Sequence, residues 1–203
     1  TPTAIDNLSA EHVAGAVELV GDVMVDVAHA VQPKVRERPL PDSLQGEFVL
    51  ATAHRAGNVD QDEPLSRLVE LLLALPLPAL FPVHPRTRKM MEGLEPDAPG
   101  LLLTDPLGYL DFLSLVADAR AVLTDSGGIQ EETTYLGIPC FTLRDNTERP
   151  VTIRAGTNTL LGLDPAAIAG IPAALAEHGD APSEPPPLWD GRAAERIADA
   201  ILG

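Results

Sequence analysis

From Glu47 onward, short apolar runs alternate with stretches in which apolar residues recur at helical spacing. The runs are rich in Val, Leu and Phe and stay apolar along their length, as strands covered on both faces must be. A repeat of strand, loop and helix is typical of an α/β fold with a parallel sheet. The expected strands are Phe48–Ala53, Ala79–Val83, Leu101–Thr104, Ala121–Thr124, Pro139–Leu143 and Thr159–Leu161. The expected helices are Glu63–Leu75, Arg86–Gly93, Tyr109–Ala117, Ile129–Leu136, Pro165–Ala176 and Ala193–Leu202.

Two proline-rich stretches divide the chain. The first, Pro33 to Gln45, is charged and has no sustained period, which favours a linker. We expect residues 1–33 to be the tail of a preceding domain and its crossover, 34–45 a linker, and 46–181 the main domain. The second stretch, Pro182 to Pro187, sets off residues 182–203 as a proline-rich segment and terminal helix. The start lacks an initiator Met and a signal-peptide pattern, so we expect the chain to be a fragment.

Composition and charge narrow the function classes. The 203 residues are 45% hydrophobic and 22% charged, which is ordinary for a folded globular protein. The net charge of −16, with 30 acidic against 14 basic residues, argues against a nucleic-acid partner. The longest apolar stretch, Leu68 to Val83, is broken by a glutamate and prolines, so no membrane span is expected.

Cysteine and histidine usage excludes two further classes of site. The single cysteine, Cys140, cannot form an intramolecular disulfide and fits a reducing cytoplasm. No Cys or His pair has the spacing of a structural zinc site, so no metal is expected.

The segment TDSGGIQEETTYLGIPC starts where an apolar strand ends at Thr124 and continues into a helix. In an open parallel sheet ligands bind beyond the carboxyl ends of the strands, and a helix N-terminus there attracts phosphate. Gly127 and Gly128 let the backbone approach a phosphate closely, and Ser126 can cap the helix or bond a phosphate oxygen. The segment predicts an anion site, although Ser-Gly-Gly taken alone also fits a plain strand-to-helix turn. Glu132, about one helical turn further, could accept hydrogen bonds from ribose hydroxyls.

The whole string resembles the nucleotide-binding signature of the UDP-N-acetylglucosamine 2-epimerases. Members of that family carry TDSGG, a glutamine with paired glutamates, an LG-P pattern and then R-D-T-T-E-R-P; here Asn146 replaces the first of those threonines. Further segments in the family's order are Ala51–Arg55 (ATAHR), Phe81–Pro85 (FPVHP), Asp105–Phe112 (DPLGYLDF) and Arg154–Asn158 (RAGTN). The resemblance covers essentially the whole chain.

The resemblance implies a fold of two Rossmann-like domains facing a cleft, as in GT-B glycosyltransferases, with this chain as the second domain plus the tail of the first. It implies non-hydrolysing interconversion of UDP-N-acetylglucosamine and UDP-N-acetylmannosamine by elimination and re-addition of UDP, with no cofactor. The carboxylates that move the proton belong to the family's first domain, so this part alone is expected to be inactive. A cytoplasmic homodimer is expected for the full-length protein.

The resemblance also implies roles for individual residues. Uridine would lie against Phe112, which on periodicity alone fits a core aromatic better, and Glu132 would hold the ribose. The diphosphate would lie over Ser126, Gly127 and Gly128 and be neutralised by Arg149, whose planar guanidinium matches phosphate oxygens.

Two histidines follow strands. His54 precedes Arg55, and both side chains could reach the carboxyl edge of the sheet. A histidine there can serve as an acid, as a base or as a hydrogen-bond donor to phosphate, and the arginine can bind substrate. A solvated loop is the alternative. The family has a glutamate where this chain reads Ala-Gly before Asn58, which leaves the role of His54 less defined. By resemblance His84, with Arg55, could belong to an activating UDP-N-acetylglucosamine site, although a surface helix start explains His84 equally well.

Three rival functions stay open. A hydrolysing relative would release UDP and free N-acetylmannosamine after the same elimination. A GT-B glycosyltransferase would bind a UDP-sugar through similar glycines and glutamate, but the HR, TDSGGIQEE and TERP segments fit the epimerases better. A non-catalytic nucleotide-sugar sensor is the third.

Overall fold

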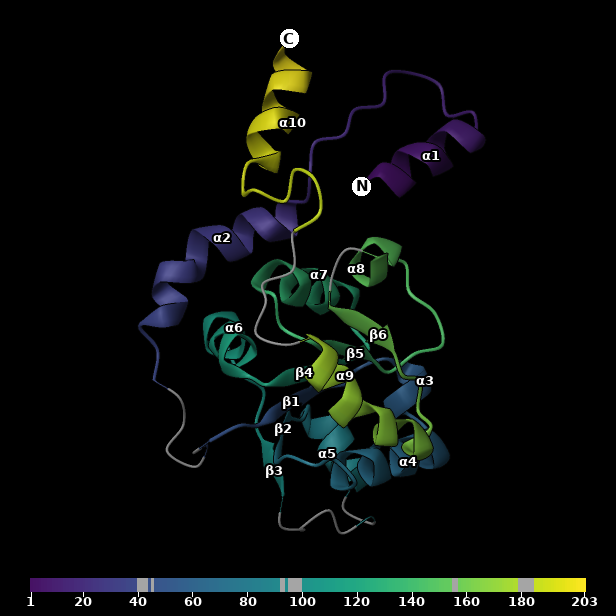
Figure 1. Ribbon diagram of the computed structural model, residues 1–203, viewed down its shortest axis with the longest axis vertical. Helices are drawn as coiled ribbons and strands as arrows, with labels where there is room; N and C mark the ends of the chain where they lie inside the picture. Colours follow the sequence, from purple (N-terminus) through teal and green to yellow (C-terminus); the bar gives the residue numbers. More distant parts are fainter. Residues whose placement is uncertain (40–43, 45, 92–93, 95–99, 155–156, 179–184) are drawn as a thin grey trace.

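The computed structural model describes residues 1–39, 44, 46–91, 94, 100–154, 157–178 and 185–203, and its centre is a sheet of parallel strands (Figure 1). The strand order is β3-β2-β1-β4-β5-β6, with every neighbouring pair parallel. The strands are β1 Val49–Thr52, β2 Ala79–Pro82, β3 Leu101–Thr104, β4 Ala121–Thr124, β5 Cys140–Thr142 and β6 Asn158–Leu160. This order is that of a Rossmann-like sheet, so the predicted fold class is confirmed.

Helices follow the strands in alternation. They are α1 Pro2–Ala10, α2 Val23–Arg36, α3 Ala56–Val59, α4 Asp62–Leu73, α5 Pro85–Met91, α6 Tyr109–Asp118, α7 Gly127–Leu136, α8 Pro150–Arg154, the 3₁₀ helix η1 Pro165–Gly170, α9 Ile171–His178 and α10 Ala193–Leu202. None of the described helices is long and apolar enough to cross a membrane.

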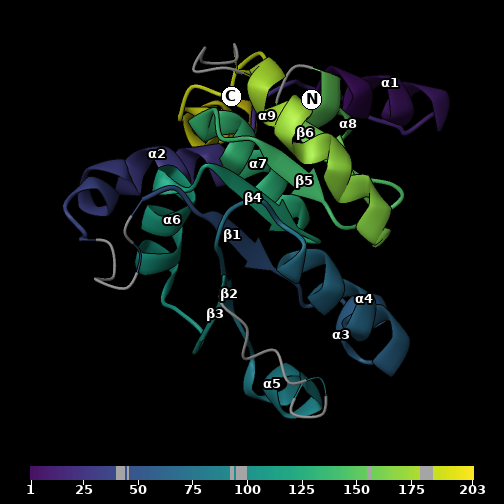
Figure 2. The same ribbon diagram turned by 60° about the horizontal axis from the view of Figure 1, so that its bottom comes forward.

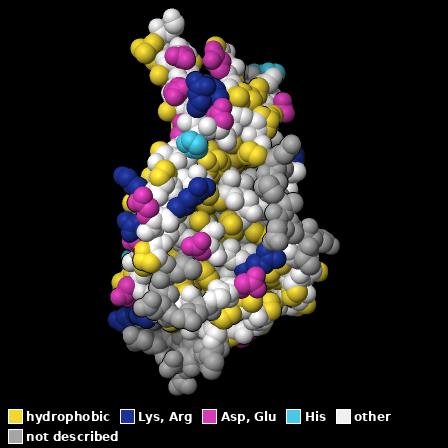
Figure 3. All heavy atoms as spheres, turned by 60° about the vertical axis from the view of Figure 1, so that its left-hand side comes forward, with side chains coloured by type: hydrophobic (Ala, Val, Ile, Leu, Met, Phe, Trp, Pro, Cys, Tyr) yellow, Lys and Arg dark blue, Asp and Glu magenta, His cyan; other side chains and the backbone are white. Residues whose placement is uncertain are grey.

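The sheet is covered on both faces, as the apolar strands predict. One hydrophobic core joins α4, α5, η1 and α9 to one face, and the other joins α2, α6 and α7 to the opposite face (Figure 2). Alternation along β1 supplies both cores, because Val49 and Ala51 enter the first and Leu50 the second. The side that carries α2 and α6 shows acidic, basic and apolar side chains interspersed over its described part (Figure 3).

Two of the predicted boundaries differ from the structure. Helix α2 runs through Pro33 to Arg36, three residues into the expected linker. Its side chains Val25, Ala28 and Val35 are buried. This packing outweighs the loss of one backbone N–H at the proline near the end of the helix. The predicted helix Pro165–Ala176 is divided into η1 and α9. The end of the predicted helix Arg86–Gly93 lies outside the described residues, as do residues 40–43 and 45 of the expected linker.

The last helix packs against the start of α2. The Asp26 carboxylate accepts hydrogen bonds from the N–H groups of Ala193 and Ala194, at 3.0 and 2.7 Å, and thereby caps α10. Trp189, in the turn before α10, is buried against Val25 and Val151. Helix α10 and α1 both project away from the sheet (Figure 1). The domain boundaries themselves remain a prediction.

Candidate functional site

The carboxyl ends of β1 and β4 lie side by side, with Thr52 in register with Thr124. The strand order reverses here: the chain passes from β1 outward to β2 and β3, then returns to β4 on the other side. Such a reversal opens a crevice at the carboxyl edge of the sheet, where doubly wound folds bind their ligands. The loop after β1 carries His54 and Arg55, and the turn after β4 carries Asp125, Ser126 and the glycines.

Asp125 organises this crevice from a fully buried position. Its carboxylate accepts hydrogen bonds from the backbone N–H groups of His54, at 3.1 and 3.2 Å, and of Arg55, at 2.9 Å. It also accepts one from the Asn58 amide at 2.9 Å, and Asn58 donates at 3.3 Å to the Leu143 carbonyl. One carboxylate therefore fixes the whole loop after β1 against β4.

The same carboxylate orients the His54 ring. Nδ1 of His54 lies 3.0 Å from Oδ1 of Asp125, while the histidine side chain is 62% exposed. Because a carboxylate accepts, this contact favours a proton on Nδ1 and leaves Nε2 as the free acceptor on the open side. A buried carboxylate thus sets the orientation of an exposed imidazole.

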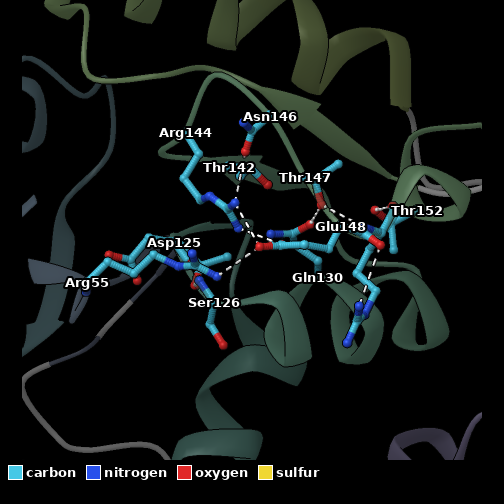
Figure 4. Close-up of polar contacts among 12 residues, drawn as sticks. Arg55, Asp125, Ser126, Gln130, Thr142, Arg144, Asn146, Thr147, Glu148 and Thr152 are labelled. Carbon is cyan, nitrogen blue, oxygen red and sulfur yellow. Dashed lines mark hydrogen bonds and ion pairs between the residues drawn. The ribbon is translucent and has the colours of Figure 1, made fainter. Parts of the chain in front are cut away.

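An exposed charge cluster lies beside this loop (Figure 4). The Arg55 Nε donates to the Asp125 carbonyl at 2.9 Å, and its guanidinium lies 3.4 Å from Glu148. Arg144 donates two hydrogen bonds to Glu148, at 2.7 and 2.9 Å. These bonds, with the Arg55 charge, hold the pKa of Glu148 down at about 2. The glutamate is therefore a fixed negative charge between two arginines.

Helix α7 starts at the crevice as the sequence predicts. Ser126 is its N-cap residue in extended conformation, and the Ser126 side chain makes no capping hydrogen bond. Gly127 has no positive φ, and a Cβ placed on it would meet nothing within 4 Å. Neither backbone strain nor packing requires a glycine at this position. The absence of a side chain instead leaves the first turn of α7 uncovered. Free N–H groups there can bind an anion.

A buried amide and hydroxyl network ties α7 to the segment after β5 (Figure 4). The side-chain oxygen Oε1 of Gln130 accepts hydrogen bonds from the Thr147 hydroxyl at 2.5 Å and from the Asn158 side-chain amide at 3.1 Å. Asn158 also donates to Thr152, at 3.0 Å, and accepts from Thr142, at 2.7 Å. Through this network the RDNTER segment has a defined position beside the crevice.

Arg149, the residue expected to meet the diphosphate, forms an ion pair with Glu131 of α7. Glu131 is 6% exposed, and it also shares a hydrogen bond with Asp22, the N-cap residue of α2. Burial, and then the Asp22 charge, raise the pKa of Glu131 to about 7, against the opposing effect of Arg149. The guanidinium is thus held by a carboxylate that takes up a proton near neutral pH.

Glu132, the expected ribose ligand, is 3% exposed. Burial raises its pKa, and the hydrogen bond from Tyr109, at 2.8 Å, opposes that rise. Tyr109 is the first residue of α6, and Phe112, one turn further, is partly buried against the core that contains α2, α6 and α7. The expected base and ribose residues therefore lie on neighbouring helices, α6 and α7, which contact each other.

His84 lies apart from this group. It follows β2 and is exposed, and its Nδ1 accepts from the Arg86 N–H at 3.3 Å. Arg86 forms an ion pair with Asp60, which ends α3. Within the described residues no hydrogen bond or ion pair joins His84 to Arg55, and their shared regulatory role stays a prediction.

Asp125, Glu131 and Tyr109 have roles that the sequence analysis did not assign. Asp125 directly follows an apolar strand, but so does Asp105, which is exposed, so the local sequence does not single out Asp125. No sequence signal pairs Tyr109 with Glu132 or Glu131 with Asp22. Among the described residues no group of three or more His, Cys, Asp or Glu could hold a metal.

The chain is similar to proteins of one enzyme family. A family model described as UDP-N-acetylglucosamine 2-epimerase matches residues 1–202. The chain is 40% identical over 172 residues to the UDP-2,3-diacetamido-2,3-dideoxy-D-glucuronate 2-epimerase of Pseudomonas aeruginosa, covering 80% of this chain and 47% of the relative. It is 33% identical over 225 residues to the UDP-N-acetylglucosamine 2-epimerase of Methanococcus maripaludis, covering 100% of this chain and 59% of the relative.

The fold is similar to solved structures as well. The Methanocaldococcus jannaschii UDP-GlcNAc 2-epimerase in complex with UDP-GlcNAc and UDP matches with a TM-score of 0.88 and 32% identity, over 100% of this chain and 59% of that one. The α/β arrangement is thus the one found in that epimerase structure. The chain spans about half the length of the curated relatives it matches.

Proposed function

The chain belongs to the UDP-N-acetylglucosamine 2-epimerase family, and on that premise we propose that it binds the UDP part of a UDP-sugar across the carboxyl edge of β1 and β4. In this assignment the diphosphate lies over Ser126, Gly127 and Gly128, and the ribose hydroxyls reach Glu132. The base lies against Phe112. Arg149 and Arg55 supply positive charge.

The observation that carries the proposal is the first turn of α7. A Cβ on Gly127 would meet nothing within 4 Å, Ser126 makes no capping hydrogen bond, and the buried carboxylate of Glu132, about one turn further, accepts a hydrogen bond from a hydroxyl group. A helix start binds phosphate and a carboxylate binds a diol, so the two together fit a nucleoside diphosphate.

The complete protein, in this proposal, interconverts UDP-N-acetylglucosamine and UDP-N-acetylmannosamine. The C2 proton and the UDP group leave, giving a C1–C2 double bond, and both then return with C2 inverted. Fixed positive charge on this part stabilises the departing diphosphate. His54, oriented by Asp125, is the candidate here for proton exchange at the sugar or phosphate. The remaining proton chemistry is assigned to acidic residues of the family's first domain.

Titration calorimetry of the 203-residue chain with UDP and with uridine tests the binding site. We expect UDP to bind and Glu132→Gln to weaken it by about 1–3 kcal/mol, the range for hydrogen bonds to a charged group. The control is Glu195→Gln, an exposed carboxylate on α10, which should leave UDP affinity unchanged. An unchanged affinity of Glu132→Gln would place the ribose elsewhere.

An activity assay separates the functions. We expect the chain alone to leave UDP-N-acetylmannosamine unchanged and the complete protein to epimerise it, with UDP still attached in the product. Turnover by the chain alone would contradict the need for another domain. Release of free N-acetylmannosamine would indicate the hydrolysing reaction. Because a relative named for a diacetamido glucuronate is 40% identical, that UDP-sugar belongs in the assay beside UDP-N-acetylglucosamine.

Two further proposals concern the oligomeric state and the cellular location of the complete protein. The complete protein is proposed to be a homodimer, which sedimentation would test. A cytoplasmic location is also proposed, and a buried, unpaired Cys140 fits a reducing compartment.

A further inference from the structure

The carboxylate of Glu132 already has a hydroxyl partner. Tyr109 donates from Oη to Oε1 of Glu132 at 2.8 Å, and this is the only hydrogen bond of the Glu132 side chain among the described residues. Glu132 is 3% exposed, whereas Tyr109 is 41% exposed. The phenol therefore lies between a buried carboxylate and solvent.

The position of Tyr109 lets it move. It is the first residue of α6 and follows the irregular segment 105–108, which ends at Gly108. Leu107 in that segment is also exposed. Side chains at helix ends with this exposure change rotamer readily. Tyr109 also lies one turn before Phe112, so both side chains border the same part of the site.

A buried carboxylate without a partner is costly, because it loses its hydration and gains nothing in return. Burial raises the pKa of Glu132, and the bond from Tyr109 opposes that rise. The phenol thus donates to this carboxylate the hydrogen bond that a sugar hydroxyl would donate with nucleotide bound.

We infer that Tyr109 Oη holds the place of a ribose hydroxyl on Glu132 when no nucleotide is bound, and that a nucleoside diphosphate must displace it. This rests on the proposed ribose role of Glu132. Displacement lowers the observed affinity by the strength of the bond that is broken. Tyr109 is therefore a residue that sets nucleotide affinity by competition.

Calorimetry of Tyr109→Phe tests the inference with UDP and 2′,3′-dideoxy-UDP. Phenylalanine keeps the ring and removes the competing hydroxyl, so UDP should bind about tenfold to a hundredfold more tightly, the range for losing a hydrogen bond to a charged group. Dideoxy-UDP has no hydroxyl for Glu132 and should bind both proteins equally. Tyr135→Phe is the matched control, since it removes a 2.7 Å hydrogen bond to His29 and should not change UDP affinity.

A second measurement does not depend on the variant folding. The chain has two tyrosines, so NMR of ring-labelled tyrosine gives two signals, which Tyr135→Phe assigns. Saturation of the wild-type chain with UDP should move the Tyr109 signal towards that of a free phenol, and dideoxy-UDP should leave it in place.

The outcomes separate this inference from the proposed function. Weaker UDP binding by Tyr109→Phe, or an unmoved Tyr109 signal, would overturn the competition while the ribose assignment stands, provided the wild type still prefers UDP over dideoxy-UDP. Equal wild-type affinity for those two ligands would remove the ribose from Glu132. No UDP binding at all would contradict the proposed function itself.

Discussion

The two sides of the crevice hold their carboxylates in opposite ways. On the loop side, Asp125 is buried but accepts four N–H contacts, from His54, Arg55 and Asn58, and exposed Glu148 is paired with arginines. On the α7 side, Glu131 pairs with Arg149 but also shares a hydrogen bond with another carboxylate, Asp22, and Glu132 has a single phenol. Accordingly, the pKa of Glu148 is lowered to about 2, whereas that of Glu131 is raised to about 7 and that of Glu132 is also raised.

This difference in hydrogen-bond partners distinguishes carboxylates that position the loop from carboxylates that can bind a ligand. A carboxylate that already has all its donors holds the loop in one geometry and gains nothing from a ligand. A buried carboxylate with one replaceable partner can exchange it for sugar hydroxyls or for a guanidinium. We therefore expect changes on the loop side to affect folding and ring orientation, and changes on the α7 side to affect ligand and proton binding.

The largest effect should come from Asp125→Asn. An amide at this position presents its own N–H groups to the donors of His54, Arg55 and Asn58, so buried donors lose their acceptor. We expect a loss of about 3 kcal/mol in the free energy of unfolding, measured in urea, because each unsatisfied buried group costs about 1–3 kcal/mol.

Asp105→Asn is the matched control. Asp105 follows β3 as Asp125 follows β4, but its side chain is 92% exposed and lies 3.5 Å from Arg88. Its substitution should change stability by less than about 0.5 kcal/mol. Equal effects of the two substitutions would mean that burial of Asp125 does not hold the loop.

The sequence predicted the sheet well and the partners of Asp125 poorly, for a physical reason. Strands such as Leu101–Thr104 and Ala121–Thr124 coincide with the prediction because an apolar run bounded by polar residues is a local signal. The crevice was also predicted, since strand ends gather at one edge of a parallel sheet. The contacts of Asp125 with His54 and Arg55 join residues 71 and 70 positions apart, and no local pattern encodes them.

The short helices were missed for a related reason. Helices α3 and α8 are too short to display a period, and α8 starts at Pro150, which the sequence analysis did not use as a helix start. Likewise, the paired glutamates Glu131 and Glu132 indicated a nucleotide site from the sequence alone. The sequence did not show which of them contacts Tyr109 and which contacts Arg149, because this depends on how α2 and α6 pack on α7.

Glu131 should give the next largest effect, as a pH dependence of stability. Its pKa is raised from 4.5 to about 7 in the folded chain, so the folded state binds more protons than the unfolded state between these values. Stability should therefore fall as pH rises from about 4.5 to about 7, by up to about 3 kcal/mol. Glu131→Gln should reduce this slope in urea unfolding measured across pH 4 to 8 (roughly the window in which the shift acts), and Glu132, whose pKa is also raised, contributes the rest with the same sign.

Glu195→Gln on α10 serves as the comparison, because it removes an exposed carboxylate of the same chain without touching α7. Its pH profile should overlay that of the unaltered chain. A Glu131→Gln profile that also overlays it would show that Glu131 does not hold a proton in the folded state.

Arg149→Lys should have a smaller effect, confined to phosphate binding. Lysine keeps the charge but not the flat two-pronged contact, so UDP affinity should fall by about 1–2 kcal/mol while uridine affinity stays the same. Calorimetry with both ligands measures the difference. Arg154→Lys, at the other end of α8, is the control, since Arg154 is exposed and contacts Thr3 at 3.3 Å. Equal losses for UDP and uridine would remove Arg149 from the diphosphate site.

The smallest effect should come from Glu148→Gln, and its pH dependence should have the opposite sign to that of Glu131. The pKa of Glu148 is lowered from 4.5 to about 2, mainly by Arg144, so its pairing stabilises the fold above pH 4.5 and is lost as pH falls towards 2. Because the side chain is 51% exposed, solvent screening limits the contribution to less than about 1 kcal/mol. The difference in unfolding free energy between the chain and Glu148→Gln should therefore shrink in acid and in high salt.

Glu63→Gln, which removes another exposed i,i+4 pair with Arg67, should match Glu148→Gln in the size of its effect on stability but leave the loop after β1 unchanged in amide exchange. A difference that grows in acid would mean that Glu148 is not held as a charge by its arginines, and the contrast between the two sides of the crevice would fail on the loop side.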